Sequence, residues 1–343
     1  MRRPLLSALP LVVALVTGPS AGPATGRMDT GGPTPAAAAA APRTTKVVIV
    51  TLDAVGSTTV RRLGRDGMPT LHRLIREGAS TLNARTAREL TMTLPNHSTI
   101  VTGRRVDAGR SGHGINWNDE RLTPRTVQRA AHHRVGSVFS AVASDRRHPA
   151  LFTAKEKLSL FKRSWPGGVD RFELRERNAR LTRLARADLV KHRRALTFLH
   201  LSLPDDAGHE HGFSSPQFDA ATRRVDRLLG TVVATIEARP QLRRRVTLIV
   251  TADHGGAGGG HYDPTEEAFF RVPFVVWGVG VEAGADLYDL NDDYRDPRSR
   301  RTRYGAARPP VRNGDAANLA TRLLGLGRVP GSEFGVGVRL DVS

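Results

Sequence analysis

Short apolar runs rich in β-branched residues alternate along the chain with segments of helical spacing. Nearly continuous apolar runs are typical of strands that are buried on both faces of a sheet. The strands predicted in this way are Lys46–Leu52, Val135–Val142, Leu196–Leu203, Val246–Thr251 and Val272–Gly278. Helices are predicted at Pro69–Glu77, Asn96–Thr102 and Phe218–Ile236, the last from the spacing of its apolar residues. This alternation predicts an α/β sandwich with a mostly parallel central sheet flanked by helices.

The first 45 residues have the composition of a leader and a tether. Residues 1–26 combine a basic start, an apolar stretch of about a dozen residues and then small residues, which fits a secretory signal peptide better than a membrane span of about 20 residues. Residues 27–45 are rich in Gly, Pro and Ala without apolar periodicity, so they are predicted to be a flexible linker. Residues 46–343 are then expected to be the single folded domain of a secreted protein with no transmembrane span in the mature chain.

Composition limits the chemistry and the partners. The chain has no cysteine, which excludes disulfides, thiolate chemistry and a Cys-ligated zinc, so any metal must be held by His and carboxylate side chains. A formal net charge of +19 would suit nucleic acid or an anionic surface. The arginines are scattered, however, and only 5% of the residues are aromatic and able to stack on bases. We therefore expect a solvated, arginine-rich surface that attracts anionic substrates, and no specific nucleic-acid partner; the oligomeric state stays open.

Acidic residues and histidines follow three of the predicted strands. Asp53 ends the first run, Asp205 and His209 follow the third, and Asp253 and His254 follow the fourth. Ligands of open α/β sheets bind beyond the carboxyl ends of the strands, so these side chains can converge although they are distant in sequence. Asp205 and His209 are also spaced i and i+4, which places both on one face of a helical turn. The pattern predicts a two-metal site.

Two further features belong to this prediction. Thr93 is a hydroxyl just ahead of a predicted helix start, where a metal-activated nucleophile would be useful. The glycines that follow His254 have no obvious packing use and leave the backbone room to approach an ion. Together these features indicate a metal-dependent hydrolase.

Several of these residues also have plainer interpretations. Asp53 could cap the next helix. Asp206 and His211 lie close enough to Asp205 and His209 to replace either as a ligand, because helical spacing alone does not separate them.

The remaining histidines require separate assignments. Zinc without cysteine usually takes three protein ligands and an open position, and His261 is the last histidine in the chain, so it is either a ligand or a histidine on a Gly-rich loop. His97 and His113 are expected to be structural hydrogen-bond donors near Thr93 rather than ligands.

Seven motifs occur in an order that resembles the type I phosphodiesterase and nucleotide pyrophosphatase branch of the alkaline phosphatase superfamily. They cover the chain from about Lys46 to Val281, and the tail from Val311 is similar to the closing helix of that family. The motifs are TLDAVG with Asp53, PTLHRLIREGA from Pro69, TLPNHSTIVTG with Thr93, HGINWN from His113, PDDAGHEHG with Asp205, TADHGG with Asp253 and RVPFVVWGVG from Arg271. The resemblance implies an alkaline phosphatase-like three-layer sandwich in which residues 46–343 are one catalytic domain.

The resemblance also implies roles for individual residues and a cofactor of two divalent metal ions, zinc. The ligands of one zinc ion would be Asp205, His209 and His261. Those of the other would be Asp53, Thr93, Asp253 and His254. Thr93 would attack phosphorus and form a phosphothreonine intermediate, with ping-pong kinetics. Asn118 would donate a hydrogen bond to a nonbridging phosphoryl oxygen.

Departures from the family pattern leave the substrate open. Leu94 stands where many nucleotide-cleaving members have a Phe that stacks on the base, and His261 comes only seven residues after His254. We therefore expect a phosphodiesterase that acts on a small-molecule or lipid phosphoester. A phosphomonoesterase, a phosphonate hydrolase and a noncatalytic secreted binder of anionic polymers are the alternatives. A monoesterase would need further cations for the extra phosphate charge, and the candidates are Arg146, Arg147, Lys155 and Lys157.

Overall fold

A mixed eight-stranded sheet forms the centre of the described part of the chain, with strand order β4-β3-β5-β1-β6-β7-β2-β8. The computed structural model describes residues 44–343. Among the strands, β7 alone runs opposite to the others, since it pairs antiparallel with β6 and β2 while the remaining pairs are parallel. The strands are β1 (Lys46–Leu52), β2 (Ala79–Arg85), β3 (His148–Thr153), β4 (Arg171–Leu174), β5 (Arg194–Leu201), β6 (Val246–Thr251), β7 (Arg271–Gly278) and β8 (Ala285–Asp286).

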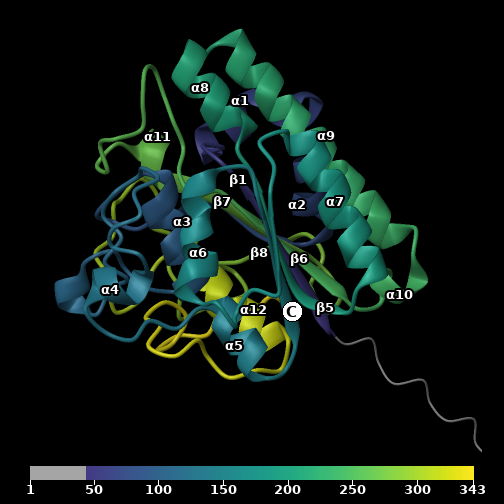
Figure 1. The fold of residues 1–343 in the computed structure, drawn as a ribbon. Coiled ribbons are helices and arrows are strands. Elements are labelled where there is room, and N and C mark those ends of the chain that lie inside the picture. The colour runs from purple at the N-terminus through teal and green to yellow at the C-terminus, as the bar shows by residue number, and fades with distance from the viewer. Residues whose placement is uncertain (1–43) are drawn as a thin grey trace, which may run out of the picture. The chain divides into compact units, whose positions relative to one another are not determined.

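Helices cover both faces of the sheet (Figure 1). The side chains of a strand alternate between the two faces, so apolar strands present a hydrophobic surface on each face that helices bury. In β1, Val48 and Val50 belong to the core under one set of helices, whereas Val47 and Ile49 belong to the core on the other face. The first set is α1 (Ser57–Gly67), α2 (Pro69–Glu77), α7 (Asn178–Lys191) and α9 (Pro216–Glu237). The second set is α3 (Thr93–Thr102), α5 (Val138–Ser144), α6 (Ser159–Ser164) and α12 (Asp315–Leu323). The result is the three-layer arrangement of an alkaline phosphatase-like fold.

The remaining helices are short and lie mainly in connections. They are α4 (Val127–Ala131), α8 (Leu203–His211), α10 (Pro240–Arg243) and α11 (Glu267–Phe270), with 3-10 turns at Ala108–Arg110 and Glu156–Leu158. Among them, α8 matters most for function because it follows β5 directly at the carboxyl edge of the sheet.

The register of the central strands aligns their carboxyl ends. Near the end of β1, Thr51 pairs with His200 of β5 on one side and with Thr251 of β6 on the other. The residues that follow these three strands therefore leave the sheet at one edge, where Asp53 and Asp253 each come two residues after a paired threonine. This edge is where the predicted site residues converge.

Most predicted elements are confirmed, and one is wrong. Four of the five predicted strands are present, α2 has the predicted bounds, and α3 and α9 extend the predicted helices by a few residues. The segment Val135–Val142 is not a strand, because Val138–Ser144 forms α5, whose first turn is stabilised by reciprocal hydrogen bonds between Ser137 and Ser140. The strands that the sequence analysis did not name are β2, β3, β4 and β8.

The predictions for the N-terminal segments concern residues that are mostly outside the described part. The signal peptide at residues 1–26 lies outside it entirely, as does the linker up to residue 43. Within residues 44–343, no helix is long and apolar enough to cross a membrane.

Candidate metal centre and active site

The metal ligands predicted from the sequence meet at the carboxyl ends of the central strands. Asp53 follows β1, and Asp253 and His254 follow β6, its neighbour in the sheet. Asp205 and His209 lie one turn apart on α8, the helix that follows β5. Three segments that are about 50 to 150 residues apart therefore contribute to one site.

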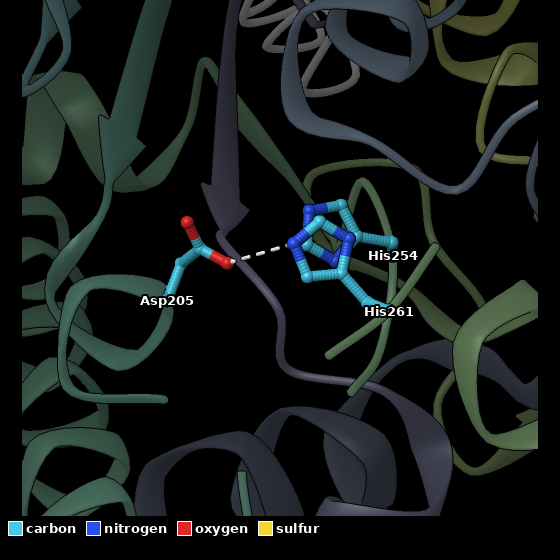
Figure 2. A group of neighbouring side chains, drawn as sticks. All are labelled: Asp205, His254 and His261. Atoms are coloured by element: carbon cyan, nitrogen blue, oxygen red, sulfur yellow. Dashed lines mark ion pairs between the residues drawn. The ribbon is translucent and has the colours of Figure 1, made fainter. Parts of the chain in front are cut away.

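One group of ligand atoms comes from Asp205, His209 and His261. The Nε2 atoms of His209 and His261 are 3.1 Å apart, and Asp205 Oδ1 lies 3.5 Å and 3.6 Å from them. Ligands of a tetrahedral zinc ion lie roughly 3.3 Å from one another, given zinc–nitrogen distances of about 2.0–2.1 Å. Figure 2 shows Asp205 facing the imidazoles of His254 and His261, which together with it form a set of atoms within 4.8 Å of one another. The spacing suits a single ion, with His254 close by.

A second group comes from Asp53, Asp253 and His254, whose ligand atoms also lie within 4.8 Å of one another. His254 Nε2 is 3.5 Å from Asp53 Oδ1 and 3.2 Å from Asp253 Oδ2. Thr93, the first residue of α3, places its buried Oγ1 atom 3.4 Å from the same nitrogen. The two groups adjoin, because the rings of His254 and His261 stack with centroids 3.9 Å apart. A hydroxyl thus lies beside a potential two-ion centre.

Backbone hydrogen bonds orient the two stacked histidines. Nδ1 of His261 donates to the carbonyl of Thr91 at 2.6 Å, and Nδ1 of His254 donates to the carbonyl of Gly255 at 2.9 Å. Burial lowers the pKa of His261 to about 2 and also lowers the pKa of His254. Both rings are therefore uncharged and present the lone pair of Nε2 to the site, which is the form of histidine that binds metals.

Three buried carboxylate oxygens have no hydrogen-bond partner among residues 44–343. They are Asp53 Oδ1, Asp205 Oδ1 and Asp253 Oδ2. Leaving such atoms unpaired is costly, and burial raises the pKa of Asp253 well above its usual value, with the charge of Asp53 adding to the effect. Each of these oxygens belongs to one of the two ligand groups. Carboxylates and uncharged imidazoles are a donor set that fits zinc, so the residues present fit a pair of such ions.

A fully buried histidine and a partly buried lysine support the carboxylates. His200 of β5, which the sequence analysis did not name, donates from Nε2 to Asp53 Oδ2 at 2.9 Å, and its Nδ1 is 3.0 Å from Thr153 Oγ1. Lys155 lies 3.0 Å from the same oxygen of Asp53 and pairs with Asp205 Oδ2. Burial acts to raise the pKa of Asp53, but Lys155 and His200 outweigh it and hold this pKa well below its usual value. A histidine inside the otherwise apolar run of β5 was the signal that could have revealed His200.

Asn118 lies at the mouth of the site with its amide oriented. Its Oδ1 accepts from the backbone N–H of Leu94 at 2.9 Å, which leaves Nδ2 to donate to a ligand, and its carbonyl accepts from Lys157 Nζ at 2.7 Å. A cavity of about 810 Å³ opens here, and its lining includes Asn118, Lys155, Lys157, Asp205 and His209. Leu94 is buried, so it offers no surface to a substrate.

The alternative ligands do not join either group. Asp206 accepts a hydrogen bond from Ser202 at 2.7 Å, and its side chain is about half exposed. His211 pairs with Glu210 at 3.6 Å.

The cations Arg146 and Arg147 precede β3, so they lie at the amino ends of the parallel strands, away from the site. Of the four cations considered for a phosphate monoester, only Lys155 and Lys157 line the cavity.

The two histidines expected to be structural donors are fully buried, with His97 on α3 and His113 in contact with this helix. His97 donates from Nδ1 to the carbonyl of Thr93, and its Nε2 is 2.9 Å from Thr51 Oγ1. His113 is 3.0 Å from Thr99 Oγ1, and burial lowers its pKa to about 3. Neither belongs to the two ligand groups.

The glycines after His254 have a packing role, contrary to the sequence analysis. A Cβ atom on Gly255 would lie 2.0 Å from the carbonyl oxygen of Ala268, and one on Gly256 would lie 2.2 Å from the ring of Phe213. These close contacts, rather than approach to an ion, account for glycine at the two positions.

With the geometry established, comparison with known proteins identifies the family. Residues 47–270 match the type I phosphodiesterase / nucleotide pyrophosphatase family, which is well over half of the chain. The chain belongs to this family. Human ectonucleotide pyrophosphatase/phosphodiesterase family member 7 is 29% identical over 189 residues, which cover 48% of this chain and 39% of that protein. Mouse GPI ethanolamine phosphate transferase 1 is 28% identical over 104 residues, which cover 29% of this chain and 11% of that protein.

Solved structures of the family share the fold. Murine ectonucleotide pyrophosphatase/phosphodiesterase 5, solved as an inactive threonine-to-alanine variant in complex with AMP, superposes with a TM-score of 0.61 at 15% identity, over 83% of this chain and 96% of that chain. The matches to the two curated relatives span less than half of the length of each.

Proposed function

We propose that the protein is a secreted, zinc-dependent phosphodiesterase in which Thr93 is the nucleophile. The observation that carries the proposal is the convergence of the histidine nitrogens and three buried carboxylate oxygens beside Thr93 Oγ1, where these oxygens have no hydrogen-bond partner among residues 44–343. Family membership and the inactive threonine-to-alanine variant of a structural relative support it. One set of residues would hold the first ion, namely Asp205, His209 and His261. The other set would be Asp53, Thr93, Asp253 and His254.

The residues of the site suit a double displacement at phosphorus. Two bound zinc ions would lower the pKa of the attacking hydroxyl and stabilise charge on the phosphoryl group. Thr93 Oγ1 attacks phosphorus while the bond to the leaving oxygen breaks, which gives phosphothreonine. Asn118 Nδ2 donates to a nonbridging phosphoryl oxygen, since its Oδ1 is already held by Leu94 N–H. Attack by water on phosphothreonine then releases the product and restores the hydroxyl.

The contacts of the two lysines favour a diester over a monoester. A monoester carries an additional negative charge that needs a free cation. Lys155 is paired with Asp53 and Asp205, and Lys157 donates to the carbonyl of Asn118. Since both lysines are engaged, neither is available for that charge without breaking these contacts.

Metal analysis combined with two esters tests the proposal. The mature protein is analysed for zinc, and its rates on bis(p-nitrophenyl) phosphate and p-nitrophenyl phosphate are measured before and after chelation. Two zinc ions per chain and a chelator-sensitive preference for the diester are expected. A preference for the monoester would show a phosphomonoesterase, and no hydrolysis of either ester by the zinc-loaded protein would favour a noncatalytic binder.

Secretion is part of the proposal and rests on the composition of residues 1–26. Expression with the native N-terminus should release a protein whose first residue lies near position 27, as determined by N-terminal sequencing of the culture medium. Retention of residues 1–26 in the cell-associated protein would contradict it.

A further inference from the structure

Four arginines line a second cavity, of about 860 Å³, beside the candidate active site. Three of them, Arg177, Arg180 and Arg183, follow one another at intervals of three residues around the start of α7, and Arg224 comes from the adjacent helix α9 (Figure 1). Glu176 is the only acidic residue in the lining. The volume lies in the range of ligand pockets, which is about 300–1,000 Å³.

These guanidinium groups are unpaired within the part of the chain that the structure describes. The nearby Arg171 and Arg175 both pair with Glu173, and Arg186 on the same helix donates to Thr235. None of the four arginines of the cavity forms an ion pair or a side-chain hydrogen bond with another of residues 44–343, and all four side chains are exposed. Like charges one turn apart on a helix repel one another, and Arg224 adds a fourth positive charge to the same cavity. The arrangement is therefore suited to an anion that bridges them.

The arginine cavity adjoins the cavity that opens at Asn118. Glu176 lines both this cavity and the one at Asn118. Asn178, in the first turn of α7, accepts from the backbone N–H of Leu203 at 3.1 Å and donates to Ser202 Oγ at 3.3 Å. Leu203 begins α8, the helix that carries Asp205, and it also lines the arginine cavity. The start of α7 is thus tied to the helix that bears a predicted metal ligand.

We propose that this cavity binds a second anionic group of the substrate, a phosphate, while the scissile phosphodiester occupies the metal centre. Guanidinium groups bind phosphate oxygens through paired, charge-assisted hydrogen bonds, and four of them can neutralise a dianion. The inference rests on the proposed function and narrows its substrate class to phosphodiesters that carry a further phosphate. A free polyphosphate could bind the same arginines. The experiment therefore distinguishes a phosphate carried by the substrate from a free anion.

The first arm of the test measures specificity. The substrates are thymidine 5′-(p-nitrophenyl phosphate) with and without a 3′-phosphate. The variant is R180Q/R183Q, and the control is R243Q/R244Q, which removes the same charge from an exposed pair just before β6, at the opposite edge of the sheet. For each protein, kcat/KM for the 3′-phosphorylated substrate is divided by kcat/KM for the substrate without the 3′-phosphate. Relative to wild type, this ratio should fall about tenfold in R180Q/R183Q and stay within about twofold in the control. Equal ratios in the two variants would overturn the proposal.

The second arm does not depend on activity. Binding of inorganic tripolyphosphate to the chelator-treated protein is measured by isothermal titration calorimetry, and R180Q/R183Q should weaken it about tenfold relative to R243Q/R244Q. Equal affinities would overturn the site itself. If R180Q/R183Q bound tripolyphosphate more weakly but kept the wild-type ratio of kcat/KM for the two substrates, the cavity would bind a free anion. Its proposed role in binding the substrate would then be wrong. Failure of the zinc-loaded wild-type protein to cleave the nucleotide esters and bis(p-nitrophenyl) phosphate would refute the proposed function alone, because this arm would still report on the cavity.

Discussion

Thr93 is the residue on which the proposed reaction depends, because its buried hydroxyl lies 3.4 Å from His254 Nε2 at the start of α3. Replacing Thr93 with Ala should lower kcat by at least about a thousandfold, since no other side chain replaces a lost nucleophile. Zinc content should stay close to wild type, because the carboxylates and histidines remain. Rates on bis(p-nitrophenyl) phosphate and zinc analysis check both parts.

Thr93→Ser is the matched control for this prediction. It restores a hydroxyl at the same backbone position, so activity should recover to a measurable fraction of the wild-type rate. If Thr93→Ala retained more than a few per cent of the wild-type activity, a covalent mechanism through Thr93 would be wrong.

His200 is expected to position Asp53 rather than to bind metal. Its hydrogen bond to Asp53 Oδ2 leaves Oδ1 to face the ligand group. His200→Phe should therefore weaken zinc binding by roughly ten- to a hundredfold, the usual effect of removing a hydrogen bond behind a ligand. Competition with a chromogenic chelator measures it. The control is His113→Phe, at a buried histidine outside both ligand groups, which should lower stability without changing zinc affinity. Equal losses of affinity in the two variants would show a general effect on folding.

At the scale of single elements, the segment that forms most of α5 shows where reasoning from the sequence fails. Val135–Val142 has the apolar character of a strand, but Ser137 accepts from Ser140 N–H at 3.1 Å and Ser140 Oγ accepts from Ser137 N–H at 2.9 Å. Local capping therefore decides a pattern that periodicity leaves ambiguous. The missed strands β3 and β4 begin with His148 and Arg171, and a polar start of this kind hides a short strand in the sequence.

The capping interaction predicts a stability effect. Ser137→Ala should lower the free energy of unfolding by about 1 kcal/mol, because the N–H of Ser140 loses its partner. Ser144→Ala, at the exposed end of the same helix, should change it by less than about 0.5 kcal/mol. Urea unfolding of the two variants provides the comparison, and equal effects would argue against the cap as the determinant of α5.

The start of α12 should contribute to the pH dependence of stability. Burial raises the pKa of Asp315 to about 6, although Tyr294 and the backbone N–H of Arg312 both donate to its carboxylate. The unfolded pKa is about 3.9, so between these values the native state binds more protons than the unfolded state. This carboxyl therefore makes the free energy of unfolding decrease as pH rises from about 4 through about 6, and it has no further effect above that.

Asp315→Asn isolates this contribution. The free energy of unfolding of the variant minus that of wild type should increase by up to about 3 kcal/mol between pH 4 and pH 7. The altered hydrogen bonds shift this difference by the same amount at every pH, so they do not affect the change. Urea unfolding at several pH values checks it, with the exposed Asp292→Asn as the control. A relative stability that does not change with pH would contradict the prediction.

For the whole molecule, the order of motifs made the fold predictable and indicated which side chains converge at the candidate site, whereas the geometry of the site could not be predicted. Asp53, Asp205 and Asp253 could be assigned to one edge because parallel strands end together. His200 and Lys155 act through contacts that cross the sheet from β5 and from the end of β3, and no spacing in the sequence reports such contacts. The proximity of Arg224 to the arginines of α7 depends in the same way on how two helices pack.

Removal of metal should destabilise the whole domain and not one loop, because the proposed ligands come from the ends of β1 and β6 and from α3 and α8. With free zinc about a thousandfold above its dissociation constant, binding adds about 4 kcal/mol to the free energy of unfolding. For a domain of this size, that corresponds to a fall in Tm of roughly 6 °C on chelation, measured by differential scanning calorimetry. Thr93→Ala should keep most of this shift, since it leaves the charged ligands in place. Asp253→Ala should lose it, because it removes one of the proposed metal ligands. An identical Tm with and without chelator in the zinc-loaded wild type would exclude a metal centre that links these elements.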